Sequence, residues 1–88
     1  MSKQQADSGL EPPAPLRTQH QHDLWDQHIR YADHLDQHSA WRAWMFIMLL
    51  DEHDADPEGF LNKPAALLEI REYAMILQLE LPARLRVH

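Results

Sequence analysis

The sequence has 88 residues, a formal net charge of −6 with its histidines neutral, and no cysteine. A chain of this length forms one small domain at most, and without cysteine it can have no disulfide, no cysteine-ligated zinc or iron–sulfur site and no thiol nucleophile. The acidic balance argues against nucleic acid and anionic membranes as partners, and the longest apolar run, residues 45–50, is far shorter than the ~20 residues that span a bilayer.

Residues 1–18 form the first segment, with one glycine, three prolines and few large apolar residues, Leu10 and Leu16 among them. This composition predicts a flexible or polyproline-like tail that adds nothing to the core, which leaves residues 19–88 as the folding domain. The N-terminus is also polar and lacks the apolar core of a signal peptide, so we expect a cytoplasmic protein.

A long first helix is predicted from Thr18 or His22 to about His53, because no proline or glycine interrupts residues 16–56. Thr18 is a suitable N-cap, and two aspartates in the early turns suit the positive end of the helix. At ~1.5 Å per residue, a helix of about 32 residues would be nearly 50 Å long, which is unusual for so small a chain.

A second helix is predicted to follow a short turn. Asp56 before Pro57 is typical of an N-cap and a first helical turn, and the second helix then runs from Pro64 to about Leu81. The last six residues alternate between polar and apolar, which predicts a short strand or an extended arm. Apolar side chains at spacings of three and four predict a packing seam on this helix, which further residues widen. The seam comprises Leu67, Ile70, Ala74, Leu77 and Leu81, widened by Leu68, Met75 and Leu79.

The first helix carries a matching apolar stripe, so the sequence predicts an all-α fold, an antiparallel helical hairpin. The stripe comprises Trp25, Ile29, Ala32, Leu35, Ser39, Ala43, Phe46 and Leu50. In its second half, however, the opposite face is also apolar, with Trp41, Trp44, Met45 and Met48, and Arg42 lies among them. One second helix cannot cover both sides, and such a patch is rarely left exposed on a monomer.

The sequence leaves three ways in which this second apolar face of the first helix could be buried. The short turn and the C-terminal arm fold back over it, two hairpins pack as a homodimer in a four-helix arrangement, or a groove of another protein receives it. We therefore predict a protein-interface site with Trp41, Arg42, Trp44, Met45 and Met48 as anchors and His34 and His38 at its rim. The predicted function is a regulator, inhibitor or accessory subunit that occupies a surface of a larger protein, in the style of proteins encoded by phages and other mobile elements.

Seven histidines suggest the alternative, a histidine-rich helical dimer that binds a metal or cofactor. His34 and His38 are four residues apart, the spacing at which two imidazoles on one helix share a metal ion. No glutamate lies inside this pair as in the zinc-protease pattern, no glycine-rich phosphate loop is present, and Ser39 lacks the strained turn that would expose a nucleophile. We therefore expect no catalytic residue, no bound metal and no cofactor. His28 and His53 lie on the core side, where we expect hydrogen-bonded structural residues.

Overall fold

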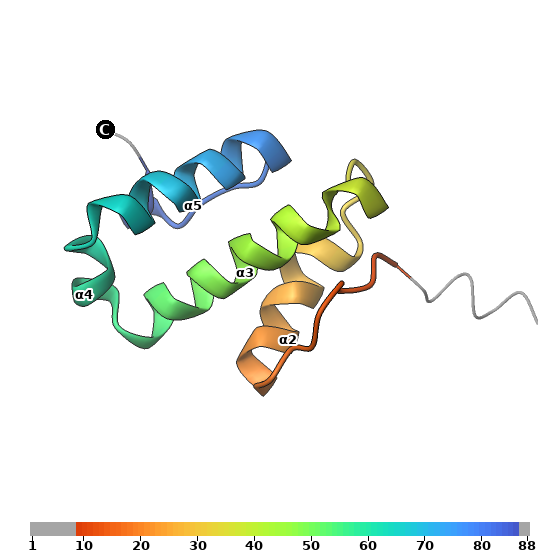
Figure 1. Cartoon of the computed structure of the whole chain (residues 1–88), viewed down its shortest axis with the longest axis horizontal. Helices are drawn as coiled ribbons and strands as arrows, with labels where there is room; N and C mark the ends of the chain where they lie inside the picture. Colours follow the sequence, from red (N-terminus) through yellow and green to blue (C-terminus); the bar gives the residue numbers. More distant parts are fainter. Residues whose placement is uncertain (1–8, 87–88) are drawn as a thin grey trace, which may run out of the picture.

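The regular elements of the computed structural model, which describes residues 9–86, are all helical, and no strand occurs within that range (Figure 1). The all-α prediction is thus confirmed. The elements in chain order are α2 (Gln19–Trp25), the π-helical turn η1 (Asp26–Arg30), the 3-10 turn η2 (Gln37–Ser39), α3 (Ala40–Ala55), α4 (Pro57–Leu61), α5 (Pro64–Leu77) and the 3-10 turn η3 (Ala83–Leu85).

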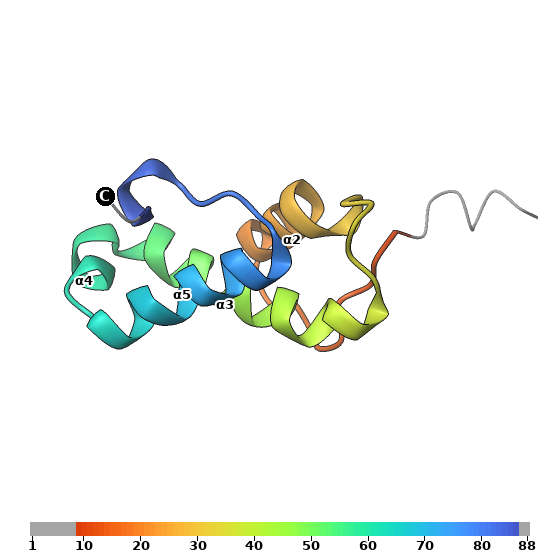
Figure 2. The same cartoon turned by 90° about the horizontal axis from the view of Figure 1, so that it is seen from above.

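Helix α3 is the middle layer of the fold, with α2 packed on one side of it and α5 on the other (Figures 1 and 2). Its buried residues therefore cover about half of its circumference rather than one narrow stripe. They are Ala40, Ala43, Phe46, Ile47, Leu49, Leu50 and His53. The apolar character of this half of α3 follows from its position, because two helices cover it from different directions.

The predicted long first helix is wrong. The chain leaves the helix after Arg30, makes a turn over residues 31–36 and starts again at Gln37. The Asp36 side chain accepts a hydrogen bond of 3.1 Å from the backbone N–H of His38, which caps the new start. In a continuous helix α2 would extend α3 along the same axis and could not pack against it, whereas the turn folds α2 back onto α3, and Trp25 is completely buried. Tertiary packing therefore decides this break, and the two-helix hairpin is replaced by several shorter helices.

The N-terminal segment packs on the fold from residue 9 onward, so the predicted tail does not include residues 9–18. The backbone N–H of Leu10 donates to the carbonyl oxygen of Arg30 at 2.9 Å, and Trp25 Nε1 donates to the carbonyl oxygen of Leu10 at 2.9 Å. Leu10 is buried in the core. Gly9 has a φ of 53°, and a Cβ there would come within 2.8 Å of the Arg30 carbonyl oxygen, so this close approach requires glycine. Residues 1–8 of the predicted tail lie outside the described residues.

The predicted helix starts are confirmed. Thr18 Oγ1 accepts from the backbone N–H of Gln21 at 3.1 Å at the start of α2. Asp56 caps α4 by accepting from the backbone N–H of Gly59 at 3.2 Å. Pro64 occupies the first turn of α5, as expected from its fixed φ and missing N–H. Such starts depend on neighbouring residues only, so they can be predicted from local sequence.

Helix α5 ends at Leu77, earlier than predicted, because Gln78 adopts a left-handed conformation with a φ of 55°. The backbone N–H of Leu79 donates to the Ala74 carbonyl at 2.9 Å, and that of Gln78 donates to the Met75 carbonyl at 3.2 Å. This is the Schellman pattern of helix termination. The chain then turns back along α5 (Figure 2).

The C-terminal segment ends in η3, which differs from the predicted strand or extended arm. Leu85 in this turn is completely buried, and its carbonyl oxygen accepts from Arg71 Nε of α5 at 2.7 Å. Burial of Leu85 in the core shared with α5 explains the helical turn, since an extended arm would keep that side chain in water. Residues 87–88 lie outside the described residues.

Candidate functional site

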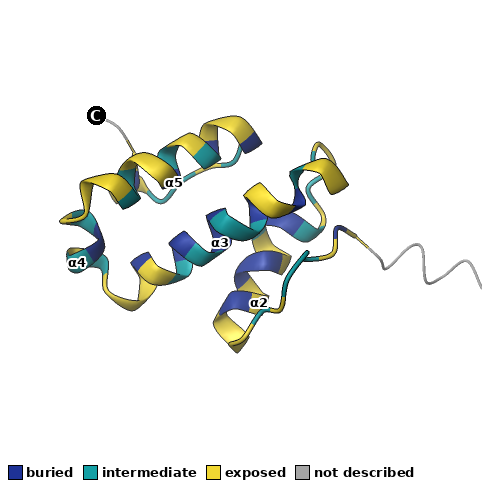
Figure 3. Ribbon diagram, in the orientation of Figure 1, coloured by how far each residue is buried: buried dark blue, intermediate teal, exposed yellow. Residues whose placement is uncertain are grey.

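Four of the five predicted anchor residues lie on the side of α3 opposite its buried residues, and two of these, Trp44 and Met48, border the N-terminal segment. We call Trp41, Trp44, Met45 and Met48 the Trp/Met surface. Trp41 is 60% exposed, and the other three side chains are half-buried. The two indole rings meet edge to face, with centroids 5.9 Å apart and an interplanar angle of 71°. Exposed and half-buried stretches follow one another along α3 in Figure 3, so this helix presents side chains to solvent as well as to the core.

A groove of about 430 Å³ borders the Trp/Met surface. Trp44 and Met48 form one wall, and Ala14, Pro15 and Arg17 of the N-terminal segment form the other, with Gln21 between them. The covering segment is therefore the N-terminal one, which differs from the α4 turn and C-terminal arm considered from sequence. The N-terminal segment covers only the edge of the Trp/Met surface formed by Trp44 and Met48, and Trp41 is left exposed.

Trp44 belongs both to this surface and to the fold. Its ring packs against the buried core cluster, and its Nε1 is buried without a hydrogen-bond partner among the described residues. An unsatisfied buried donor costs about 1–3 kcal/mol, so a substitution at Trp44 changes the stability of the fold. Trp41 is mostly exposed, so its substitution should change the stability of the fold much less.

The two histidines predicted at the rim do not share a helical face. His34 lies in the turn after η1, and its Nε2 donates to the carbonyl oxygen of Leu77 at 2.9 Å, which ties this turn to the end of α5. His38 lies in η2 and is exposed. A metal ion shared by these two histidines would require both of them on one continuous helix, and the chain has no such helix here. In residues 9–86, no three histidine or carboxylate side chains are grouped so that they could hold a metal ion.

His53 has the structural role predicted for it. It is buried, its Nδ1 lies 2.9 Å from Asp54 Oδ1, and its ring meets the Phe60 ring edge to face at 5.7 Å. The other carboxylate oxygen of Asp54 lies 2.7 Å from His20 Nε2. This carboxylate therefore links α2 to α3, and the imidazole of His53 links α3 to α4.

His28 makes the stability of the fold depend on pH. Burial lowers the pKa of its imidazole below the ordinary 6.5, and the Asp54 carboxylate opposes this shift. The folded state thus binds the proton less readily than the unfolded state, so stability is fully present above pH 6.5 and is lost as pH falls through the lowered pKa. We expect the free energy of unfolding, measured with urea, to fall between pH 7.5 and 5.

The His28→Gln variant should lose part of this slope, because glutamine does not titrate. His22→Gln removes an exposed histidine from the same region and controls for the change in charge. Equal slopes in the wild type and in His28→Gln would contradict the assignment.

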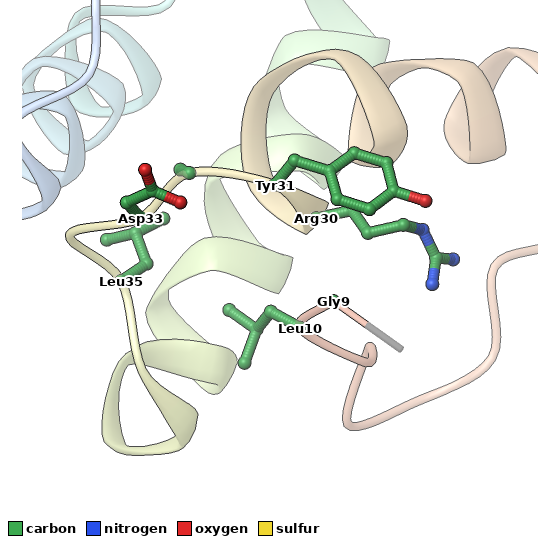
Figure 4. Close-up of a pocket in the computed structure, with 7 residues that line it drawn as sticks. Gly9, Leu10, Arg30, Tyr31, Asp33 and Leu35 are labelled. Atoms are coloured by element: carbon green, nitrogen blue, oxygen red, sulfur yellow. The ribbon is translucent and has the colours of Figure 1, made fainter. Parts of the chain in front are cut away.

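A second pocket, of about 380 Å³, lies where the N-terminal segment meets the turn after η1 (Figure 4). Arg30 at its edge is already engaged, because Asp26 Oδ1 lies 2.6 Å from its Nε and Glu11 Oε2 lies 3.4 Å from its Nη1. The hydrogen bond to Asp26 raises the pKa of Arg30 above its ordinary value. The pocket thus lies at a contact between two segments of the fold, and the charge of Arg30 is balanced by Asp26 and Glu11.

Sequence reasoning missed a second apolar face, on α5. Leu68, Met75 and Ile76 are 62%, 72% and 56% exposed, so the prediction that Leu68 and Met75 widen the packing seam is wrong. The periodicity contained the signal: at ~100° per residue, Leu68 and Met75 lie more than 100° from the buried Ile70. The predicted seam was too wide because Leu68 and Met75 were assigned to it for their apolar character and not for their angle on the helix.

Comparisons with known proteins give no assignment: no family model matches the chain, and no curated protein or solved structure matches it significantly. Among the described residues, the helices are all too short or too polar to cross a bilayer.

Proposed function

We propose that this chain is a small protein-binding module, a regulator, inhibitor or accessory subunit that occupies a surface of a larger protein with its Trp/Met surface. The observation that carries the proposal is Trp41, a tryptophan 60% exposed on a 16-residue helix, whose ring contacts that of Trp44 in the wall of a groove. Tryptophan, methionine and arginine are enriched at protein interfaces, and tryptophan is a frequent binding hot spot. The module acts in the cytoplasm, without catalysis or cofactor, as proteins of mobile elements often do.

The rigidity of α3 supports this role. Its inner half is held by α2 and α5, so Trp41 and Met45 are presented from a helix that needs no ordering when a partner binds. Methionine adapts to irregular surfaces, while the indole supplies a large apolar area. The exposed Arg42 adds a charged donor at the edge.

Trp41→Ala is expected to weaken partner binding by ~2 kcal/mol or more, about thirtyfold, because a hot-spot indole is lost. Folding should change by less than about 0.5 kcal/mol, because the side chain is mostly in solvent. The partner would be captured by a photocrosslinking residue in place of the exposed His38, which leaves Trp41 intact, and its affinity then measured by calorimetry. Tyr31→Ala is the matched control, since this aromatic residue is 64% exposed and lies in a different part of the fold.

Equal affinities for Trp41→Ala, Tyr31→Ala and the wild type would contradict the proposal. Light scattering coupled to size exclusion, at micromolar concentration, separates the two kinds of partner. A dimer that Trp41→Ala converts to a monomer would identify a second copy of the chain as the occupant of the Trp/Met surface, in place of a different protein.

A further inference from the structure

Beyond the Trp/Met surface, we propose that the outer face of α5 is a second docking surface, whose occupant is a basic amphipathic helix of another protein. The face consists of Leu68, Met75 and Ile76, with Glu69 and Glu72 between them. Met75 is seven positions after Leu68, and Ile76 is next to Met75, so at ~100° per residue all three lie on the side of α5 opposite its buried residues Ile70 and Leu77. Three large apolar side chains that are all more than half exposed on one helix form a stripe of the kind that an amphipathic helix covers.

A groove extends this face toward the C-terminal segment. Its volume is about 410 Å³, and Met75, Ala74, Leu79 and Leu81 supply its apolar lining. The groove exists because the left-handed Gln78 sends the chain back along α5. An apolar side chain of the partner can enter it beside Met75, while the neighbouring turns of the partner lie over Leu68 and Ile76.

The charges of the face select a basic partner. Glu69 and Glu72 are exposed and form no ion pair within residues 9–86, and the exposed Glu80 adds a third carboxylate at the groove, against the two positive charges of Arg71 and Arg86. Arg71 and Arg86 lie at the groove edge, but they direct their N–H groups toward the C-terminal segment. Arg71 Nε donates to the Leu85 carbonyl at 2.7 Å, and Arg86 Nε donates to the Leu81 carbonyl at 2.9 Å. Lysine or arginine residues flanking the apolar side of a partner helix therefore complement the two glutamates.

A second copy of this chain fits the face less well. Two α5 helices packed face to face would bring four glutamates together, and like charges at such distances repel. At ~1.5 Å per residue, the 14 residues of α5 give a footprint ~21 Å long and ~10 Å wide. That is well below the ~800 Å² per partner of a standard stable interface. A short helix from another protein matches this footprint.

The test uses the full chain, labelled with ¹⁵N, and a synthetic 14-residue helical peptide with leucine at positions i, i+3, i+4 and i+7 and lysine elsewhere. We expect peptide-induced amide shifts confined to α5 and residues 78–81, and an affinity that falls in 0.5 M salt. Glu72→Lys and Met75→Ser should each weaken binding at least tenfold. Glu58→Lys, an exposed acid on α4, and Trp41→Ala should change it less than twofold.

Three outcomes would overturn the proposal. Equal binding of a peptide with glutamate in place of lysine would show that charge does not select the partner. Equal losses in Glu58→Lys and Glu72→Lys, or shifts spread over the chain, would show attraction by net charge alone. Self-association that Met75→Ser abolishes, measured by sedimentation, would make a second copy the occupant. Because Trp41→Ala leaves the expected α5 signal unchanged, failure here is distinct from failure of the Trp/Met surface.

Discussion

Replacement of Trp25 by alanine is expected to lower the free energy of unfolding by about 3–5 kcal/mol. The indole is completely buried, and its Nε1 donates a hydrogen bond of 2.9 Å to the carbonyl oxygen of Leu10. The substitution therefore opens a cavity between α2 and α3 and also leaves that carbonyl without its donor. Since small domains are stable by only ~5–15 kcal/mol, the variant should be largely unfolded at modest urea concentrations.

Urea unfolding followed by circular dichroism at 222 nm measures this loss. Trp25→Phe is the matched variant, because it keeps an aromatic ring but removes the donor to Leu10, and it should lose less stability than Trp25→Ala. A loss below about 1 kcal/mol for Trp25→Ala would mean that α2 contributes little to the core, contrary to the packing described above.

Leu85→Ala is expected to cost about 2–5 kcal/mol, although the residue stands close to the end of the chain. Its side chain is completely buried and belongs to the same core as Ile70 and Leu77 of α5. Loss of the side chain would also weaken the turn whose carbonyl accepts from Arg71 Nε at 2.7 Å. The C-terminal segment should then detach from α5.

Thermal unfolding measures the effect, and Arg84→Ala serves as the control, because Arg84 is exposed in the same turn. The control should change stability by less than about 0.5 kcal/mol. If Leu85→Ala unfolds at the same temperature as Arg84→Ala, the C-terminal segment is not part of the cooperative fold.

The parts of the fold that could be predicted from sequence depend on neighbouring residues. The caps at Thr18 and Asp56 and the start at Pro64 each involve a hydrogen bond or a fixed φ within a few positions. The turn over residues 31–36 contains neither glycine nor proline, and its local signal is Asp36 alone, which caps the new start at Gln37. Its cause is the burial of α2 against α3, which only the folded chain shows.

The candidate surface was predictable to the same extent. Helical periodicity placed Trp41, Trp44, Met45 and Met48 on one side of α3, because all four lie within a continuous helix. The pairing of His34 with His38 assumed that this helix also included residues 34–38, and it fails where the helix does. That the surface binds another protein, or a second copy, stays a prediction.

Helix α3 packs against both α2 and α5, so the stability of either outer helix depends on α3. Loss of α2 would expose one side of α3 to water, and the backbone hydrogen bonds of α3 would then open more often. While α2 and α5 are both in place, the amide protons of α3 should exchange with solvent only when the whole domain unfolds. Ligands bound to α3 or to α5 would each slow that exchange, so the two surfaces are linked through one shared folding equilibrium.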